Sequence, residues 1–317
     1  MQYLQIAFLI VFGSIAAACL LSVLFSFFLT SAVIRPPIRS HKIALDYHIK
    51  YNGVSPDYFP SLEKDKWQFK STTGAMLYGY WISPSEPLSG RYMIMVHGHG
   101  HNMMGSLKYL PLFLSRGFKV LIYDQIHSGI SEGKFTTMGM VEAQDLSLII
   151  DRLYQSDLKP ELLGLLGESM GAATVIMNIC NDHRAHFAIA DCPYADLEEQ
   201  LAYRLKYAYK LGKFPLLPIG SLISKLRAGF FWKQVSPIRQ LVENQGMPDI
   251  PVLFAHGLKD TYIPAAAAKR LFEAKTGYRD LLLSEDAKHT ESICKDNQAY
   301  DQAVSRLIAT AEANITQ

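Results

Sequence analysis

The chain opens with a long uncharged stretch and then changes to a pattern of short apolar runs. Residues 1–34 carry no charged side chain, and residues 4–34 are almost wholly apolar. A helix needs about 20 apolar residues to cross a bilayer, and this stretch exceeds that length. A cleaved signal peptide would have a basic start and a shorter apolar core. The pattern therefore predicts a retained transmembrane anchor helix over residues 4–34.

Residues 35–65 are predicted to be a juxtamembrane linker, because proline recurs in them and interrupts regular elements. The prolines are Pro36, Pro37, Pro56 and Pro60. No Lys or Arg precedes the apolar stretch, whereas three basic residues follow it closely: Arg35, Arg39 and Lys42. By the positive-inside rule this asymmetry favours a single-pass membrane protein whose C-terminal domain lies on the cytoplasmic side.

From residue 66 to residue 317, apolar runs of strand length alternate with segments of helical periodicity. A hairpin is expected around Thr73-Gly74, followed by strands at 92–96, 119–123, 161–166, 187–190, 252–255 and 280–284. Helices are expected at 106–116, 140–154, 170–180, 265–273 and 297–313. This alternation predicts an α/β fold, with a mostly parallel central sheet covered by helices on both faces.

The segment between the strands at 187–190 and 252–255 is longer than an ordinary connection, which predicts a helical cap over about 196–247. Between Leu201 and Lys233 it carries seven basic side chains, several aromatic ones and no acid. In the simplest interpretation, the aromatic side chains of this lid pack on the core and its cations are solvated. In a functional interpretation, the lid faces an anionic membrane surface or guides an acyl or acidic substrate.

The charge and cysteine content exclude some classes of function. The chain has 31 basic and 29 acidic residues, a net charge of +2, which gives no general reason to expect binding to nucleic acid. Its four cysteines form no C-x-x-C pair. We therefore expect no disulfide framework, no metal site built on cysteine and no cofactor.

The strongest chemical motif is Gly167-Glu168-Ser169-Met170-Gly171, which fits G-x-S-x-G between a predicted strand and a predicted helix. A serine in this context occupies a sharp turn that points its hydroxyl into a cleft, and the glycines leave room for the neighbouring backbone. The following helix directs its first N–H groups at developing negative charge. The sequence therefore predicts Ser169 as a nucleophile, against the alternative of an ordinary glycine-rich loop.

A serine hydroxyl needs a base to take its proton and an acid to orient that base. Asp260 follows the strand at 252–255, and His289 follows the last strand, so both lie at the sheet edge that also holds Ser169. We predict His289 as the base and Asp260 as the acid. Asp191 and Asp286 are rival acids. His256, before a glycine turn, is expected to be structural.

The tetrahedral intermediate of such a reaction needs two backbone N–H donors for its oxyanion. Met170, the residue after the nucleophile, is expected to supply one of them. His99, in the run His97-Gly98-His99-Gly100-His101, is expected to supply the other. The alternating histidines could instead bind a metal, but the two glycines favour a turn, and we rate this alternative lower.

These motifs resemble the α/β-hydrolase superfamily and, more narrowly, membrane-anchored bacterial α/β-hydrolases of the serine aminopeptidase and prolyl-oligopeptidase branch. The resemblance spans roughly residues 67–315 and is carried by residues 97–98, 106–109, 121–124, 167–171, 189–194, 200–204 and 256–260. It implies an α/β-hydrolase domain over 66–317 with a catalytic triad. One departure lies at Asp124-Gln-Ile-His-Ser-Gly-Ile-Ser131, where relatives often have Arg and Gly at the third and fourth positions.

The fold hosts many chemistries, so the substrate class has to be weighed separately. We expect the substrate to be a small-molecule carboxylic (acyl) ester that is hydrolysed through an acyl-enzyme, because the aromatic side chains of the cap suit an acyl chain. No acidic pair suggests capture of a peptide amino terminus, so a serine peptidase with the same triad is the second hypothesis. The third is a non-catalytic, membrane-tethered binding module, which retention of Ser169, Asp260 and His289 disfavours.

Overall fold

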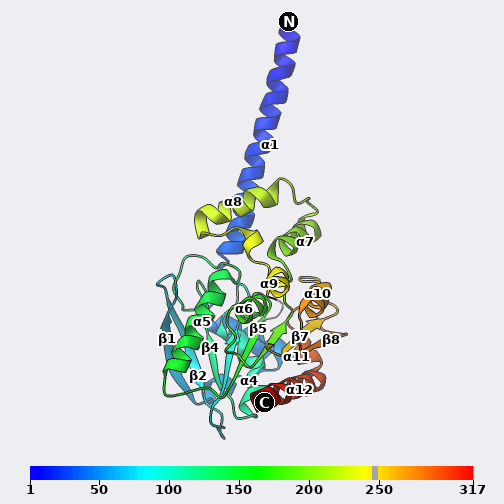
Figure 1. Cartoon of the computed structure of the whole chain (residues 1–317). Coiled ribbons are helices and arrows are strands. Elements are labelled where there is room, and N and C mark those ends of the chain that lie inside the picture. Colours follow the sequence, from blue (N-terminus) through cyan, green and yellow to red (C-terminus); the bar gives the residue numbers. More distant parts are fainter. Residues whose placement is uncertain (245–248, 317) are drawn as a thin grey trace.

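The central element of the structure is a twisted eight-stranded sheet in the order β1-β2-β4-β3-β5-β6-β7-β8 (Figure 1). The structure, a computed structural model, describes residues 1–244 and 249–316. The strands are β1 (Lys64–Lys70), β2 (Met76–Ile82), β3 (Arg91–Val96), β4 (Lys119–Tyr123), β5 (Leu162–Glu168), β6 (Phe187–Asp191), β7 (Val252–Gly257) and β8 (Arg279–Ser284). The strands β3 to β8 pair in parallel, and the β1–β2 hairpin joins the sheet antiparallel through β2 and β4.

Helices cover both faces of this sheet. They are α1 (Gln2–Ile34), α2 (His41–Asn52), α3 (Tyr58–Ser61), η1 (Met103–Lys108), α4 (Leu110–Leu114), α5 (Met140–Gln155), α6 (Met170–Ile179), α7 (Leu197–Tyr209), α8 (Leu216–Ala228), η2 (Trp232–Gln234), α9 (Pro237–Glu243), α10 (Ala266–Ala274), α11 (Ser292–Lys295) and α12 (Asn297–Ile315). One core cluster joins the sheet to η1, α4, α11 and α12, and the opposite one joins it to α5, α6, α9 and α10.

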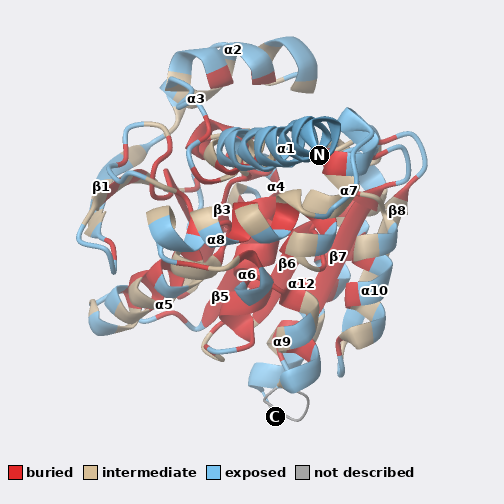
Figure 2. Cartoon of the chain, turned by 90° about the horizontal axis from the view of Figure 1, so that it is seen from above, coloured by how far each residue is buried: buried red, intermediate tan, exposed pale blue. Residues whose placement is uncertain are grey.

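The middle strands β5, β6 and β7 are buried along their whole length (Figure 2). A parallel sheet covered on both faces requires this, which is why these strands are continuous apolar runs rather than alternating ones. The predicted mostly parallel α/β fold is confirmed. All strand and helix positions expected for residues 119–190 agree with the structure to within two residues.

Two local expectations were wrong. The single helix expected over 106–116 is two short helices, η1 and α4, because Pro111 has no N–H to donate and lies in the first turn of α4. The segment 35–65 is not free of regular elements but contains α2 and α3. The side chain of Ser40 caps α2 by accepting from the Ile43 N–H, and Gly53 ends it with a φ of 67°.

The cap expected over 196–247 contains α7, α8, η2 and α9; its expected end at 247 lies outside the described residues. In Figure 1, α7 and α8 lie between the sheet and the projecting part of α1. The α1 helix has 33 residues and is long and apolar enough to span a membrane. No part of its most apolar 18-residue stretch is buried.

Candidate active site

Ser169 lies at the tip of a sharp turn between β5 and α6, with φ 56° and ψ −113°. The left-handed φ is unfavourable for a residue with a side chain and is held in place by the surrounding backbone. A Cβ on Gly171 would lie 2.0 Å from the Val96 carbonyl oxygen, and one on Gly167 would lie 2.1 Å from the Gly171 carbonyl oxygen. Only glycine fits at these two positions, so the motif fixes the strained turn that presents the serine hydroxyl.

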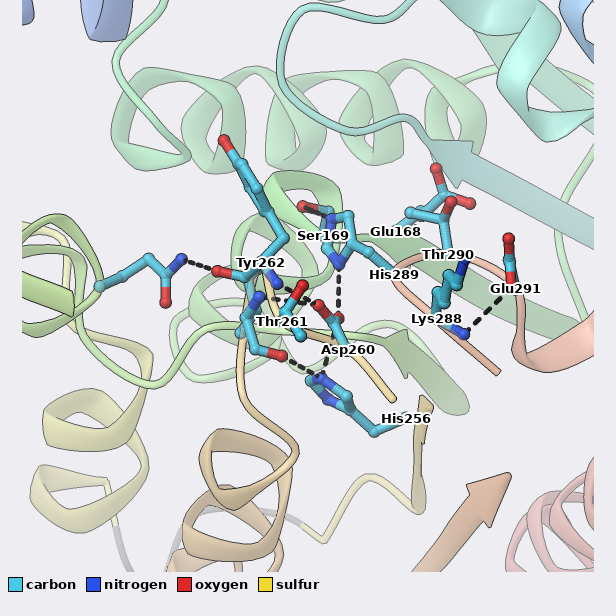
Figure 3. A network of polar contacts seen from close by, with 12 residues as sticks. Glu168, Ser169, His256, Asp260, Thr261, Tyr262, Lys288, His289, Thr290 and Glu291 are labelled. Atoms are coloured by element: carbon cyan, nitrogen blue, oxygen red, sulfur yellow. Dashed lines mark hydrogen bonds and ion pairs between the residues drawn. The ribbon is translucent and has the colours of Figure 1, made fainter. Parts of the chain in front are cut away.

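The three residues predicted as nucleophile, base and acid form a continuous chain of hydrogen bonds (Figure 3). His289 Nε2 lies 3.1 Å from Ser169 Oγ, and His289 Nδ1 lies 2.6 Å from Asp260 Oδ2. A carboxylate can only accept, so Nδ1 carries the proton and Nε2 is free to accept from the serine hydroxyl. The arrangement is competent for general-base activation of the serine.

Asp260 is held as an anion by several donors. Its Oδ1 accepts from the backbone N–H groups of Tyr262 and Ile263, each at 2.8 Å. On the other side His256 Nε2 lies 3.2 Å from Oδ2 and also donates to the Ile263 carbonyl at 2.8 Å. Burial alone would raise the pKa of Asp260, but the hydrogen bonds from His256 and His289 hold that pKa well below its ordinary value. His256, expected to be structural, therefore also touches the acid.

The two rival acids lie elsewhere. Asp286 is exposed and forms an ion pair with Lys259. Asp191 ends β6 in a fully buried position, where its Oδ2 lies 2.9 Å from the Tyr109 hydroxyl oxygen. Neither makes a hydrogen bond to His289 among the described residues.

The loop expected to complete an oxyanion hole packs directly against the nucleophile. A Cβ on Gly98 would lie 3.3 Å from the Ser169 Cβ. The loop is fixed by His97, whose Nε2 accepts from the Gln125 N–H and whose Nδ1 therefore donates to the Gly98 carbonyl. Within the part of the chain that the structure describes, the backbone N–H groups of His99 and Met170 donate to no other protein group. Both donors are thus available at this edge of the sheet.

The alternating histidines do not converge on a common point. His97 bonds Gln125, His99 Nε2 donates to the Val33 carbonyl at 2.7 Å, and the His101 ring packs against the ring of His48. Among the described residues, ligand atoms of Cys192, Asp260 and His289 do lie within 4.8 Å of one another. Burial raises the pKa of the Cys192 thiol well above its ordinary value, so it stays protonated and is a poor metal ligand.

A buried ion pair that the sequence did not predict lies behind the nucleophile. Lys108 Nζ lies 2.5 Å from Glu168 Oε2 and donates to the Thr290 carbonyl, also at 2.5 Å. Burial would lower the pKa of the Lys108 ammonium, but Glu168 raises it above its ordinary value. The pair therefore stays charged, and it links the residue before Ser169 to the residue after His289.

Tyr109 extends this network to a second carboxyl. Its hydroxyl lies 3.0 Å from Glu168 Oε2 and 2.9 Å from Asp191 Oδ2, yet it has a single hydrogen to donate. Burial raises the pKa of Asp191, which favours its protonated form. A protonated Asp191 can donate to the Tyr109 oxygen while Tyr109 donates to the Glu168 anion, so the single hydrogen of Tyr109 suffices for both contacts.

The loop that departs from the usual hydrolase pattern keeps a tight shape. His127, in the place where relatives often have glycine, adopts a φ of 57°. Gly129 has a φ of 53°, and a Cβ there would lie 2.0 Å from Asp124 Oδ2. The Asp124 carboxylate accepts from the backbone N–H groups of Met103 and Ile130, which closes the loop without the arginine.

A cavity of about 220 Å³ lies beside the triad. Its lining is mainly apolar and comes from α1, from the cap and from loops next to the triad: Leu29, Ala32, Val33, His99, Met138, Leu201, Arg204, Leu205, Ala208, Tyr209, Leu216, Leu217, Trp232 and Tyr262. The Tyr262 ring, which lines the cavity, lies 5.0 Å from the His289 ring, centroid to centroid, so this wall of the cavity adjoins the triad. Tyr262 is tied to the cap, because Gln200 Nε2 donates to its carbonyl at 2.7 Å.

Comparison with known proteins places this site in a family. The model of the family described as X-Pro dipeptidyl-peptidase (S15 family) matches residues 47–214, just over half of the chain. The uncharacterized protein YqkD of Bacillus subtilis is 38% identical over 253 residues, which cover 79% of this chain and 81% of that protein.

Solved structures share the fold. The esterase Pf2001 of Pyrococcus furiosus superposes with a TM-score of 0.67 at 21% identity, covering 88% of this chain and 98% of that one. The acylaminoacyl peptidase of Pyrococcus horikoshii gives a TM-score of 0.59 at 17% identity, covering 81% of this chain and 44% of that one. With the family match, these likenesses show that the chain belongs to the X-Pro dipeptidyl-peptidase (S15) family and is a hydrolase of the α/β-hydrolase superfamily, on its serine peptidase-like branch.

Proposed function

We propose that the protein is a serine hydrolase that cleaves carboxylic esters through an acyl-enzyme formed on Ser169. The observation that carries the proposal is the unbroken chain of hydrogen bonds from Ser169 through His289 to Asp260. In it the imidazole has an oriented tautomer and a buried anionic partner, as a general base requires. The strained turn at Ser169 supports the same role, because it fixes the hydroxyl in place before the substrate arrives.

In the proposed reaction, His289 Nε2 takes the Ser169 proton while Oγ attacks the ester carbonyl carbon. The backbone N–H groups of His99 and Met170 stabilise the oxyanion. The C–O bond to the alcohol then breaks, and His289 returns the proton to the departing oxygen. Water attacks the acyl-enzyme with His289 again as base, which releases the carboxylic acid and restores the serine hydroxyl.

The lining of the cavity favours an ester over a peptide. Among the described residues that line it, Arg204 is the one permanent cation, and none carries a carboxylate. A peptidase that binds a free amino terminus needs an anion to receive it, whereas an acyl chain needs apolar walls. Peptide hydrolysis is the second candidate, because the family to which the chain belongs is described as a dipeptidyl-peptidase family.

We further propose that α1 is a retained anchor and that the hydrolase domain lies on the cytoplasmic side, where Arg35, Arg39 and Lys42 would also lie. Retention is supported by contacts between the end of α1 and the rest of the chain. The Ile34 carbonyl accepts from the Thr136 N–H at 2.9 Å, and the Val33 carbonyl accepts from His99. Cleavage would remove partners from the loop beside Ser169.

A fluorophosphonate probe tests the proposal directly, because it labels only an activated serine. We expect labelling of the full chain in detergent to be lost in Ser169→Ala and His289→Ala and kept in His183→Ala, a half-buried histidine outside the site. A chromogenic ester and an X-Pro anilide then separate the two candidates. Labelling that persists in Ser169→Ala, or a folded wild type that never reacts, would refute the serine mechanism.

A further inference from the structure

The apolar helix α1 contributes a wall of the cavity next to the triad. Leu29, Ala32 and Val33 line the cavity from α1, and the cap closes it from the other side through residues of α7, α8 and η2. An apolar cavity of about 150 Å³ can hold one benzene molecule. The cavity here, about 220 Å³, therefore has room for part of an acyl chain.

The last third of α1 is fixed to the cap by specific contacts. Ser26 Oγ donates to the Leu216 carbonyl and Thr30 Oγ1 to the Gly220 carbonyl, each at 3.1 Å. Arg227 Nη1 donates to Ser31 Oγ at 2.6 Å. Ser26 and Thr30 are fully buried in this contact. These contacts explain the polar residues in the last third of α1, and α1 is part of the folded body at this end.

The surface of the cap has the character of a membrane-facing surface. Large apolar side chains are exposed on α8 and on the loop before it: Leu211, Phe214, Leu222 and Leu226. Cations on the same segment are accompanied by no acid between Leu201 and Lys233. Exposed apolar groups among cations are typical of segments that lie in the interface of an anionic bilayer. Figure 1 shows this cap where α1 leaves the body, at the level where a membrane around α1 would begin.

From these observations we infer that the substrate is a long-chain acyl ester that enters from the bilayer along α1, with its acyl chain in the cavity against Leu29 and Val33. This inference rests on the proposed function and names its substrate class. The acyl chain of the substrate would pass from the lipid tails to the apolar walls of the cavity without crossing water. The ester carbonyl would then lie next to Ser169. The helix that anchors the enzyme then also selects what it cleaves.

The test compares two neighbouring positions on α1 in the full chain, reconstituted in phosphatidylcholine–phosphatidylglycerol vesicles. Leu29→Trp fills the cavity, whereas Phe28→Trp changes an exposed neighbour that does not line it. We measure kcat/KM for p-nitrophenyl butyrate and laurate. Leu29→Trp is expected to lower the laurate-to-butyrate ratio about tenfold, and Phe28→Trp is expected to leave it unchanged. An unchanged ratio in Leu29→Trp would overturn the inference.

Labelling by a short-chain fluorophosphonate keeps the two proposals separable. If wild type labels and the ratio does not respond, the serine mechanism stands and the acyl site is wrong; if wild type neither labels nor cleaves esters, both fail. Should Leu29→Trp lose labelling through misfolding, Leu29→Ala replaces it. That variant enlarges the cavity and should raise the ratio, and an unchanged ratio again refutes the acyl site.

The route through the bilayer has its own measurement. A fluorogenic long-chain ester is placed either in the vesicles that hold the enzyme or in separate vesicles. Entry along α1 predicts faster cleavage in the shared vesicles, in proportion to the surface density of the ester. Equal initial rates in the two arrangements would refute entry from the bilayer.

Discussion

The buried pair of Lys108 and Glu168 allows a prediction that separates stability from catalysis. Their side chains are 3% and 7% exposed, and both stay charged because each compensates the other. Lys108→Met removes the cation and leaves the Glu168 carboxylate buried without its main partner. Breaking a buried pair in this way costs about 3–5 kcal/mol of the free energy of unfolding. We expect a loss of this size for Lys108→Met.

The double variant Lys108→Met/Glu168→Gln should recover most of that loss, because no uncompensated charge remains and the amide can still accept from Tyr109. Activity should not recover. Lys108 also donates to the Thr290 carbonyl, and that anchor of the His289 loop is missing in both variants. The stability of the double variant should therefore approach that of wild type while its labelling rate stays near that of the single variant.

Urea unfolding followed by tryptophan fluorescence measures the first quantity, and the rate of fluorophosphonate labelling of the folded protein measures the second. Glu168→Gln alone completes the double-mutant cycle and gives the coupling free energy of the pair. If the double variant is as unstable as Lys108→Met, the cost does not come from an uncompensated charge. If labelling recovers together with stability, Lys108 has no role in positioning the His289 loop.

Three further changes test other parts of the site. Gly171→Ala places a Cβ 2.0 Å from the Val96 carbonyl oxygen, so it should cost about 3 kcal/mol in urea unfolding and abolish labelling. His256→Phe removes a donor to Asp260, which should raise the pKa of that carboxyl and slow labelling about tenfold. Burial lowers the pKa of His48 from 6.5 to about 4, so below pH 6.5 the unfolded chain takes up a proton that the folded chain does not. The free energy of unfolding should fall by up to about 3 kcal/mol as the pH drops through that window, and His48→Phe should make the fall shallower.

The parts of the site that follow strands could be predicted from sequence. Ser169 comes directly after β5, Asp260 follows β7, and His289 follows β8. Parallel strands end at one edge of the sheet, so local patterns of apolar runs were sufficient to bring distant residues together. The structure places these three side chains within hydrogen-bond distance of one another.

The contacts behind the nucleophile could not be predicted in this way. Lys108 and Glu168 are 60 positions apart, and a lysine within a predicted helix is expected to be solvated. In the structure η1 places Lys108 against the Thr290 carbonyl of the His289 loop, where the lysine side chain is 3% exposed. The same segment was also wrongly predicted as one helix over 106–116. The helical pattern continues across Pro111, but proline has no backbone N–H to donate, so the helix is split there.

The hydrogen-bond partners of the serine and threonine side chains of α1 show which part of the helix packs against the cap. In a helix that only anchors, a hydroxyl in the apolar run has no required partner and is usually satisfied by its own backbone, as Ser22 is by the Ala18 carbonyl. Thr30 instead donates to the Gly220 carbonyl, and a Cβ on Gly220 would lie 3.0 Å from Thr30 Oγ1 and 2.4 Å from the Trp232 ring. Such close packing fixes the rotation of α1 about its axis, and this rotation decides which side chains face the cavity. The position of the helix and the shape of the cavity are therefore set by the same contacts. If the cavity is the proposed acyl site, a change at Thr30 or Gly220 should alter chain-length preference before it alters anchoring.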